Sequence, residues 1–215
     1  LKSDIEGRIG ARFEPQHLVV SYLDGALKSG PTLARQFAQQ HGLMARVCPR
    51  DELSKWLQGD GNCKALLFVD DLVGSGESVV RGLGQLEQDL VGCRALDAGT
   101  YLVAVCGTER ADIRLRESDL SERLSLRQFF GEILGDADEV FGGRSRYFEE
   151  PGDLERALTM FSEVGSKVYR RAPLGYGNAG LAVVFEHTCP NNSLPALWGE
   201  NREWKPLFPR HGSAV

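Results

Sequence analysis

The chain has 215 residues, of which 42% are hydrophobic and 26% are charged, a composition typical of a soluble globular protein. This length suits one α/β domain with an appended segment. The formal net charge of −5 argues against broad, direct nucleic-acid binding, which requires a basic surface. No apolar run approaches the roughly 20 residues of a membrane-spanning helix, so we expect no membrane association.

The cysteines and histidines show no spacing typical of a disulfide framework or a zinc site. The five cysteines contain no C-x-x-C pair, and their odd number indicates reduced thiols. The four histidines lack the spacing of metal ligands. We therefore expect a cytoplasmic protein without structural zinc.

Strands and helices alternate along the first part of the chain. Residues 17–23 are predicted to form a strand, followed by a glycine-containing loop and a helix over residues 32–41. Residues 65–69 form a continuous apolar run, as expected of a strand buried on both faces. A Gly/Ser loop follows this second strand and leads into a helix over residues 77–90.

Two further strands are predicted, at residues 100–106 and at residues 137–141, the latter after an amphipathic stretch at 120–134. This alternation favours an α/β fold, a parallel sheet flanked by helices. Ligands of such sheets bind outside the carboxyl ends of the strands. The loops at residues 24–31 and 72–78 should therefore lie at the same edge.

The pattern changes after about residue 150. We expect a helix over residues 152–164, a turn-rich loop at 173–178 and a strand at 181–186, followed by a tail rich in Pro, Asn and Trp. Three regions are expected. They are an N-terminal segment at 1–16, a core at 17–170 and a C-terminal hood at 171–215. Because the chain begins with Leu rather than Met, we expect that the N-terminal segment is truncated.

The segment LLFVDDLVGSGES, residues 66–78, carries the strongest chemical signal. Asp70 and Asp71 follow a rigid apolar strand, where carboxylates can accept hydrogen bonds from two sugar hydroxyls and lie near a divalent cation. The glycines allow the backbone to approach an anion, and the loop feeds a helix N-terminus. Ser75 and Ser78 add hydroxyl donors. Together these features match the shape of a ribose 5-phosphate.

This segment resembles the signature of type I phosphoribosyltransferases, with departures at Phe68, where an aliphatic is commoner, and Gly74, where Thr or Ser is typical. The loop DGALKSG at 24–30 resembles the pyrophosphate loop of that family. The resemblance implies a Rossmann-like fold with a C-terminal hood. It also implies binding of phosphoribosyl pyrophosphate (PRPP) or a nucleotide, and magnesium-dependent transfer or cleavage of the 5-phosphoribosyl group.

The resemblance also implies roles for particular residues. Asp70 and Asp71 would orient the ribose and lie near Mg²⁺, through ribose hydroxyls or water, and Lys28 would be the third catalytic residue. Substrate contacts would come from the two loops: Ser29, Gly30, Val73, Gly74, Ser75, Gly76, Glu77 and Ser78. Glu77 is equally consistent with an acid favoured by the helix dipole.

The C-terminal sequences PLGYGN, VVFEHTCPNNSLPALW and WKPLFPR resemble a group of bacterial phosphoribosyltransferase-like proteins from conflict and phage-defence loci, some beside retrons. This implies an effector of an antiviral defence system that has protein partners. The alternative is a catalytically inactive nucleotide-binding regulatory module. The sequence does not identify the acceptor base. It also leaves open whether the chain forms a homo-oligomer.

Simpler interpretations compete with these. An Asp pair at a strand end is also found in receiver-like phosphoacceptor pockets or plain turns. His187 and Cys189 could form a nucleophile pair, but no third orienting group is identifiable. Three aromatic residues are more typical of packing than of base stacking: Trp198, Trp204 and Phe208. The run Asn191-Asn192-Ser193 is typical of a turn or a set of backbone caps.

Overall fold

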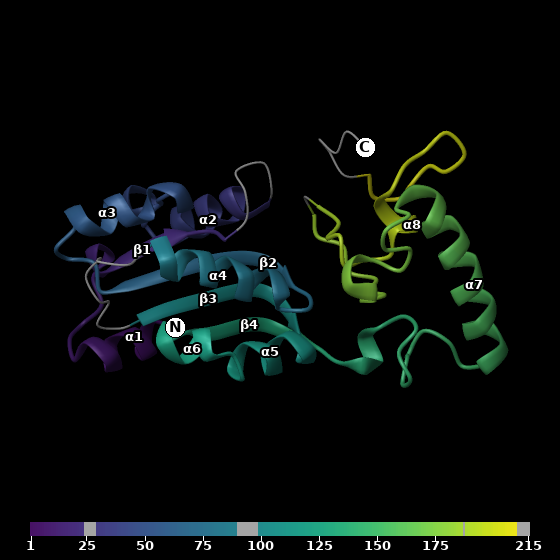
Figure 1. The fold of residues 1–215 in the computed structure, drawn as a ribbon, viewed down its shortest axis with the longest axis horizontal. Helices are drawn as coiled ribbons and strands as arrows, with labels where there is room; N and C mark the ends of the chain where they lie inside the picture. Colours follow the sequence, from purple (N-terminus) through teal and green to yellow (C-terminus); the bar gives the residue numbers. More distant parts are fainter. Residues whose placement is uncertain (24–28, 90–98, 187, 210–215) are drawn as a thin grey trace. The chain divides into compact units, whose positions relative to one another are not determined.

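A computed structural model describes residues 1–23, 29–89, 99–186 and 188–209 (Figure 1). The chain divides into two compact units, unit 1 (Leu1–Ile133) and unit 2 (Leu134–Val215). None of the helices in the described ranges is both long and apolar enough to cross a membrane.

Unit 1 is built on a four-stranded parallel sheet in the order β1-β2-β3-β4. The strands are β1 (Leu18–Ser21), β2 (Ala65–Val73), β3 (Gly99–Thr108) and β4 (Arg127–Leu134). In the parallel register of the first three strands, Val20 pairs with Leu67, and Leu67 pairs with Tyr101. The core of β2 is buried on both faces, as its continuous apolar sequence predicts. The predicted α/β class is therefore confirmed.

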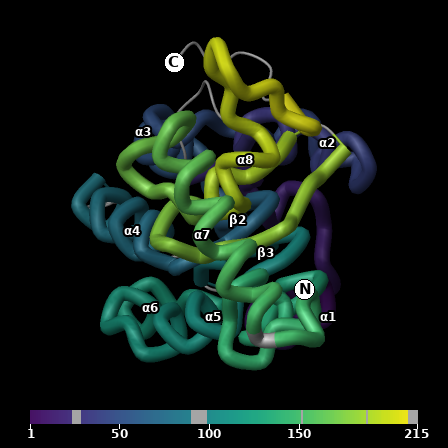
Figure 2. Tube along the Cα trace, turned by 90° about the vertical axis from the view of Figure 1, so that its right-hand side faces the viewer, coloured from purple at the N-terminus to yellow at the C-terminus, as the bar shows by residue number. Residues whose placement is uncertain are grey.

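Helices cover both faces of this sheet. They are α1 (Lys2–Ile9), α2 (Ser29–Gln40), α3 (Leu53–Gly59), α4 (Glu77–Asp89), α5 (Glu109–Arg116) and α6 (Asp119–Arg123), with 3-10 turns at Pro15–His17, Met44–Arg46 and Arg50–Glu52. Figure 2 shows α3, α4, α5 and α6 on one side of the strands and α1 and α2 on the other.

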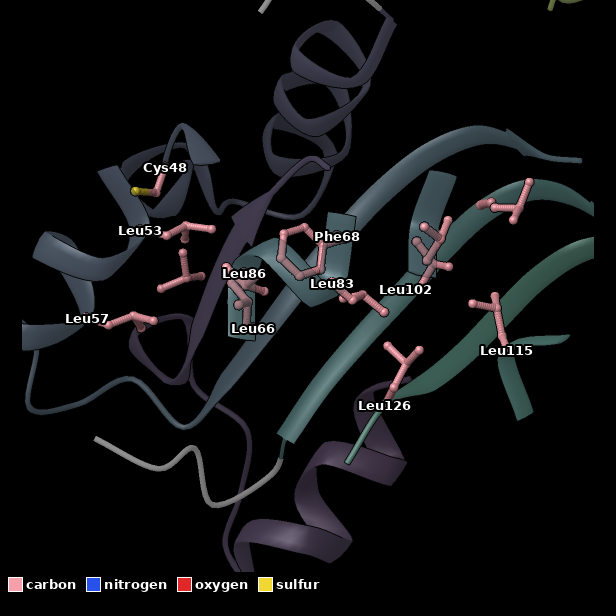
Figure 3. Close-up of a cluster of buried hydrophobic side chains, with 14 of the residues drawn as sticks. Cys48, Leu53, Leu57, Leu66, Phe68, Leu83, Leu86, Leu102, Leu115 and Leu126 are labelled. Atoms are coloured by element: carbon pink, nitrogen blue, oxygen red, sulfur yellow. The ribbon is translucent and has the colours of Figure 1, made fainter. Parts of the chain in front are cut away.

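Two buried apolar clusters correspond to the two faces. The first joins Phe68 and Leu102 of the sheet to Leu83 of α4 and to residues of α3 and α5 (Figure 3). The second joins the opposite face to α1 and α2 and includes Ile5, which is 1% exposed. The N-terminal helix is therefore an integral part of the core of unit 1.

The helices change face between β1 and β2. After α2 the chain returns to the outer edge of β1, where Val47 forms an isolated parallel bridge with Val20. Cys48 N–H donates to Val20 O at 2.9 Å, and the Ser21 hydroxyl donates to Cys48 O at 2.7 Å. The chain then crosses through α3 on the opposite face to reach β2. The four strands nevertheless follow chain order from β1 to β4, and only the single bridge of Val47 lies on the outer side of β1.

Unit 2 contains α7 (Pro151–Val168), the short α8 (Pro195–Trp198) and 3-10 turns at Asp136–Asp138 and Tyr176–Asn178. Leu181 and Leu194 are almost fully buried, and Tyr169 contacts Trp198 with ring centroids 5.3 Å apart. A Cβ at Gly165 of α7 would lie 1.9 Å from Pro173 O, so only glycine permits this approach of helix and loop.

Two predicted strands were wrong. The fourth strand occupies Arg127–Leu134, within the stretch expected to be amphipathic, and the predicted strand at 137–141 begins in a 3-10 turn. Asp138 favours the turn because its carboxylate accepts the N–H of Gly135 at 2.9 Å.

The predicted strand at 181–186 is reduced to isolated bridges, two of them at Leu181. Leu181 and Phe185 bond to other backbone groups, whereas side chains supply the partners of Val183. The carbonyl of Val183 accepts from the Ser193 hydroxyl at 2.6 Å and from the Cys189 thiol at 3.6 Å.

Candidate active site

The acid pair lies inside β2 rather than after it. The strand extends to Val73, and Asp70 pairs with Ala104 of β3, so the prediction that the acids end the strand was wrong. Each carboxylate accepts the N–H of the next residue: Asp70 Oδ1 from Asp71 at 2.9 Å, and Asp71 Oδ1 from Leu72 at 2.8 Å. Asp71 is 8% exposed and Asp70 is half-buried. The ladder and these bonds fix both carboxylates near the carboxyl end of the sheet.

Cys106 of β3 lies beside this pair. Its thiol donates to Asp71 O at 3.9 Å, and its side chain is buried. Burial, followed by the negative charges of Asp71 and Glu132, raises the pKa of Cys106 to about 12. The thiol is therefore protonated at neutral pH, and Cys106 is unsuited to act as a nucleophile next to the acids.

The loop that follows β2 is held against α5. Gly76 has φ 72°, a left-handed conformation that disfavours any β-branched residue, and a Cβ there would lie 3.4 Å from the Cα and O atoms of Ala111. The hydroxyl of Thr108 donates to Gly74 O and accepts the N–H of Ala111 at 3.1 Å. The loop is thus packed on its α5 side before α4 begins at Glu77.

The other side of this loop carries the predicted phosphate contacts. Gly74 and Gly76 are buried, Ser75 is half-buried, and Glu77 and Ser78 are exposed. Ser75 Oγ accepts the N–H of Glu77 at 3.4 Å. Within the described ranges, the backbone N–H groups of Ser75, Gly76 and Ser78 have no acceptor. Such a row of donors at a helix N-terminus can bind a phosphate dianion.

The second predicted loop is only partly described. Lys28 lies outside the described residues, as do residues 24–27. Ser29 and Gly30 form the first turn of α2 rather than part of an open loop. A Cβ at Gly30 would lie 2.9 Å from Tyr22 Cβ, so glycine lets α2 begin directly beside the end of β1.

The parallel pairing of β1 and β2 places the carboxyl ends of these two strands at the same edge of the sheet. One predicted loop follows β1 and the other follows β2, and each leads into a helix. The assignment of substrate-binding and catalytic roles to these residues stays a prediction. The structure adds Thr108, which the sequence analysis missed, although a Thr before Glu109 and an apolar-periodic stretch is an N-cap signal.

Among the described residues, no group of three or more His, Cys, Asp or Glu side chains is arranged to hold a metal ion. Mg²⁺ is commonly bound through one or two carboxylates together with substrate oxygens rather than by a complete protein cage. The acid pair of β2 fits this mode of binding, in which the ligand completes the coordination.

The C-terminal segment from residue 187 to residue 204 has a structural role in unit 2, where it is described. Cys189 is buried, and His187 lies outside the described residues. The indole N–H groups of Trp198 and Trp204 donate to Ser193 O and Ala196 O, each at 2.9 Å, and the Asn192 amide donates to Tyr176 O at 3.1 Å. These contacts bear out the packing and capping interpretation for Trp198, Trp204 and Asn192, whereas Phe208 is 43% exposed.

The parallel sheet, the acid pair of β2 and the glycine loop before α4 define a Rossmann-like α/β protein of the phosphoribosyltransferase type. A family model described as PRTase-CE matches residues 6–210. The chain belongs to this phosphoribosyltransferase-like family, and the match spans both units. No curated protein matches the chain significantly.

Proposed function

We propose that the chain binds PRPP or a nucleotide in the presence of Mg²⁺ and transfers or cleaves its 5-phosphoribosyl group. The observation that carries the proposal is the succession, along one strand and its loop, of two fixed carboxylates and a row of backbone N–H groups. Asp70 and Asp71 accept hydrogen bonds from the ribose hydroxyls. Residues 73–78 hold the 5-phosphate, and residues 28–30 bind the pyrophosphate.

In the reaction with PRPP, the bond from C1 of the ribose to the pyrophosphate oxygen breaks, and its electron pair leaves with pyrophosphate. The acceptor forms the new bond at C1 and releases a proton. Asp70 and Asp71 are the residues that would hold Mg²⁺, through ribose hydroxyls or water, and the ion would stabilise the charge on pyrophosphate. The carboxylates favour the transition state by keeping the ribose oriented while positive charge develops on its ring.

Replacement of Asp70 and Asp71 with Asn tests the ribose site. Asn Oδ1 preserves the acceptor that each residue offers to the next N–H, so the strand end should keep its structure. Charge-assisted hydrogen bonds contribute about 1.5–3 kcal/mol each, so PRPP affinity with Mg²⁺ should fall at least about tenfold in calorimetry. The control is Asp119→Asn, an exposed acid in the first turn of α6. Unchanged affinity in a folded double variant would place the ribose elsewhere.

Pyrophosphate release separates an enzyme from a regulatory module. Lys28→Ala should lower turnover with PRPP more than it weakens PRPP binding, because only interactions made in the transition state raise the rate of chemistry. Release is measured over a panel of bases and nucleotides, with saturating Mg²⁺. Clear PRPP binding by the wild type without release on any of these acceptors would favour the inactive nucleotide-binding module.

A role as an effector in bacterial antiviral defence belongs to the same proposal. Its support is the resemblance of residues 173–210 to proteins of defence loci. Expression of the wild type and the Asp70/Asp71 double variant in phage-challenged bacteria tests it. Equal plaque counts for the two would separate the phosphoribosyl site from any defence activity.

A further inference from the structure

We propose that Thr108, the last residue of β3, is a positioning residue that orients the phosphate-binding loop through contacts on the side that faces α5. The inference rests on the proposed function, because it assigns to Thr108 the alignment of the backbone donors that would bind the 5-phosphate. Thr108 has no place in the acid pair or in either predicted loop.

The Thr108 hydroxyl makes two hydrogen bonds. It donates to Gly74 O and accepts the N–H of Ala111, so one buried group joins the loop after β2 to the first turn of α5. Thr108 is 3% exposed, and water therefore has little access to replace either bond. The N-cap bond stabilises α5, whereas the bond to Gly74 has no role in that helix.

The contact with Gly74 determines where the next donor points. The carbonyl and the N–H of one trans peptide point in opposite directions, and the described residues include no cis peptide. When Thr108 holds the carbonyl of Gly74 toward α5, the N–H of Ser75 must point away from α5. This N–H has no acceptor among the described residues, and it is therefore directed to the side on which a phosphate would be bound.

A second contact supports the same alignment. Gly76 packs against the backbone of Ala111 in the first turn of α5, with the left-handed φ of 72°. Both ends of the short loop from Gly74 to Gly76 are thus held against α5. We infer that the loop is ordered before the ligand binds, which lowers the entropic cost of phosphate binding.

Thr108→Val keeps the shape of the side chain and removes both hydrogen bonds, while Thr108→Ser retains the hydroxyl. The matched control is Ser121→Ala, because Ser121 is a buried residue of α6 whose hydroxyl donates to Leu115 O, away from the loop. Affinity for ribose 5-phosphate and for ribose is measured by calorimetry. We expect a loss of about tenfold for ribose 5-phosphate in Thr108→Val, less than about twofold in Ser121→Ala, and restoration in Thr108→Ser.

Amide hydrogen exchange tests the positioning without a ligand. Faster exchange of Val80 N–H, which donates to Gly76 O at 3.0 Å, is expected in Thr108→Val but not in Ser121→Ala. If the valine variant does not fold, Thr108→Asp retains an acceptor for Ala111 N–H but cannot donate to Gly74 when ionised, and should show the same faster exchange. Equal exchange in these variants and the wild type would overturn the proposal. A wild type that binds no ribose 5-phosphate, with the exchange difference present, would instead refute the proposed function.

Discussion

In unit 1 the backbone polar groups of the core pair with one another along neighbouring strands, whereas in unit 2 side chains provide many of the partners. The 32-residue stretch between Tyr176 and Leu207 illustrates the second mode: its carbonyls accept from Asn192, Ser193, Trp198 and Trp204 side chains. Both modes satisfy buried backbone groups. They differ in what they require of the sequence, because a ladder needs only apolar residues in a strand, while the second mode needs particular residues at particular positions.

The candidate site of unit 1 is positioned mainly by regular secondary structure. The acids of β2 are held by the ladder to β3, and the loop after β2 is held by α5. Regular elements therefore support the site, and one polar side chain, Thr108, completes it. Truncations in the two units can test whether apolar burial dominates the stability of one and polar contacts that of the other.

The largest effect is expected from Phe68→Ala in unit 1. Phe68 is fully buried in β2 and packs in the cluster with Leu83 and Leu102. Loss of a buried aromatic ring typically costs about 3–5 kcal/mol of unfolding free energy. Urea denaturation followed by circular dichroism measures it, and Val105→Ala, which truncates a 53% exposed residue of β3, is the control. A cost below about 1 kcal/mol for Phe68→Ala would contradict the claim that apolar burial dominates the stability of unit 1.

A smaller effect is expected from Ser193→Ala in unit 2. Ser193 is fully buried, and its hydroxyl donates to Val183 O at 2.6 Å, where the Cys189 thiol is a weaker and more distant donor. A buried acceptor that loses its partner costs about 1–3 kcal/mol. Thermal and urea unfolding measure the loss against Ser166→Ala, an exposed serine of α7. Equal stability of the two variants would mean that this hydroxyl does not support unit 2.

The sequence predicted β1, β2, β3, α2 and α4 of unit 1, for a physical reason, but it did not predict α1 or α3 and misplaced β4. The apolar runs of β1, β2 and β3 and the amphipathic faces of α2 and α4 follow local periodicities, and the helices began within three residues of the expected positions. The strand at 181–186 was predicted from the same kind of pattern and was wrong. Of its apolar residues only Leu181 is buried, and Ser193 supplies a bond that a neighbouring strand would otherwise make.

The candidate site could be predicted only in part. The order of acids, glycines and helix start is local, so it was visible in the sequence. The contact between Thr108 and Gly74 joins residues 34 positions apart, and the bridge of Val47 to Val20 places one residue at a sheet edge. Neither leaves a periodic signal, because each depends on how distant elements pack. The change of sheet face between α2 and α3 could therefore be seen only in the fold.

The smallest effect is expected from Asp60→Asn, which tests a place where unit 1 also uses side chains. Arg46 donates to Asp60 Oδ2 at 2.5 Å and to the carbonyl of Leu18 at the start of β1 at 2.9 Å, and its guanidinium lies 4.3 Å from the ring centroid of Trp56. The Arg46–Asp60 pair is partly buried, so its loss should cost about 1 kcal/mol of unfolding free energy at pH 7.

The pH dependence distinguishes this contribution from a general loss of packing. Burial alone would raise the pKa of Asp60, but hydrogen bonds from the N–H of Asn62 and from Arg46, together with the charge of Arg46, lower it below the ordinary value. A folded-state pKa below the unfolded one contributes stability above the unfolded pKa, and this contribution is lost as the pH falls through the folded pKa. The difference between wild type and Asp60→Asn, measured by urea denaturation at several pH values, should be constant from pH 7 to about pH 5. It should then shrink below about pH 4, near the ordinary pKa of Asp. A difference that grows toward low pH would show that Asp60 stabilises unit 1 in its protonated form, and the ion pair with Arg46 would not be its source.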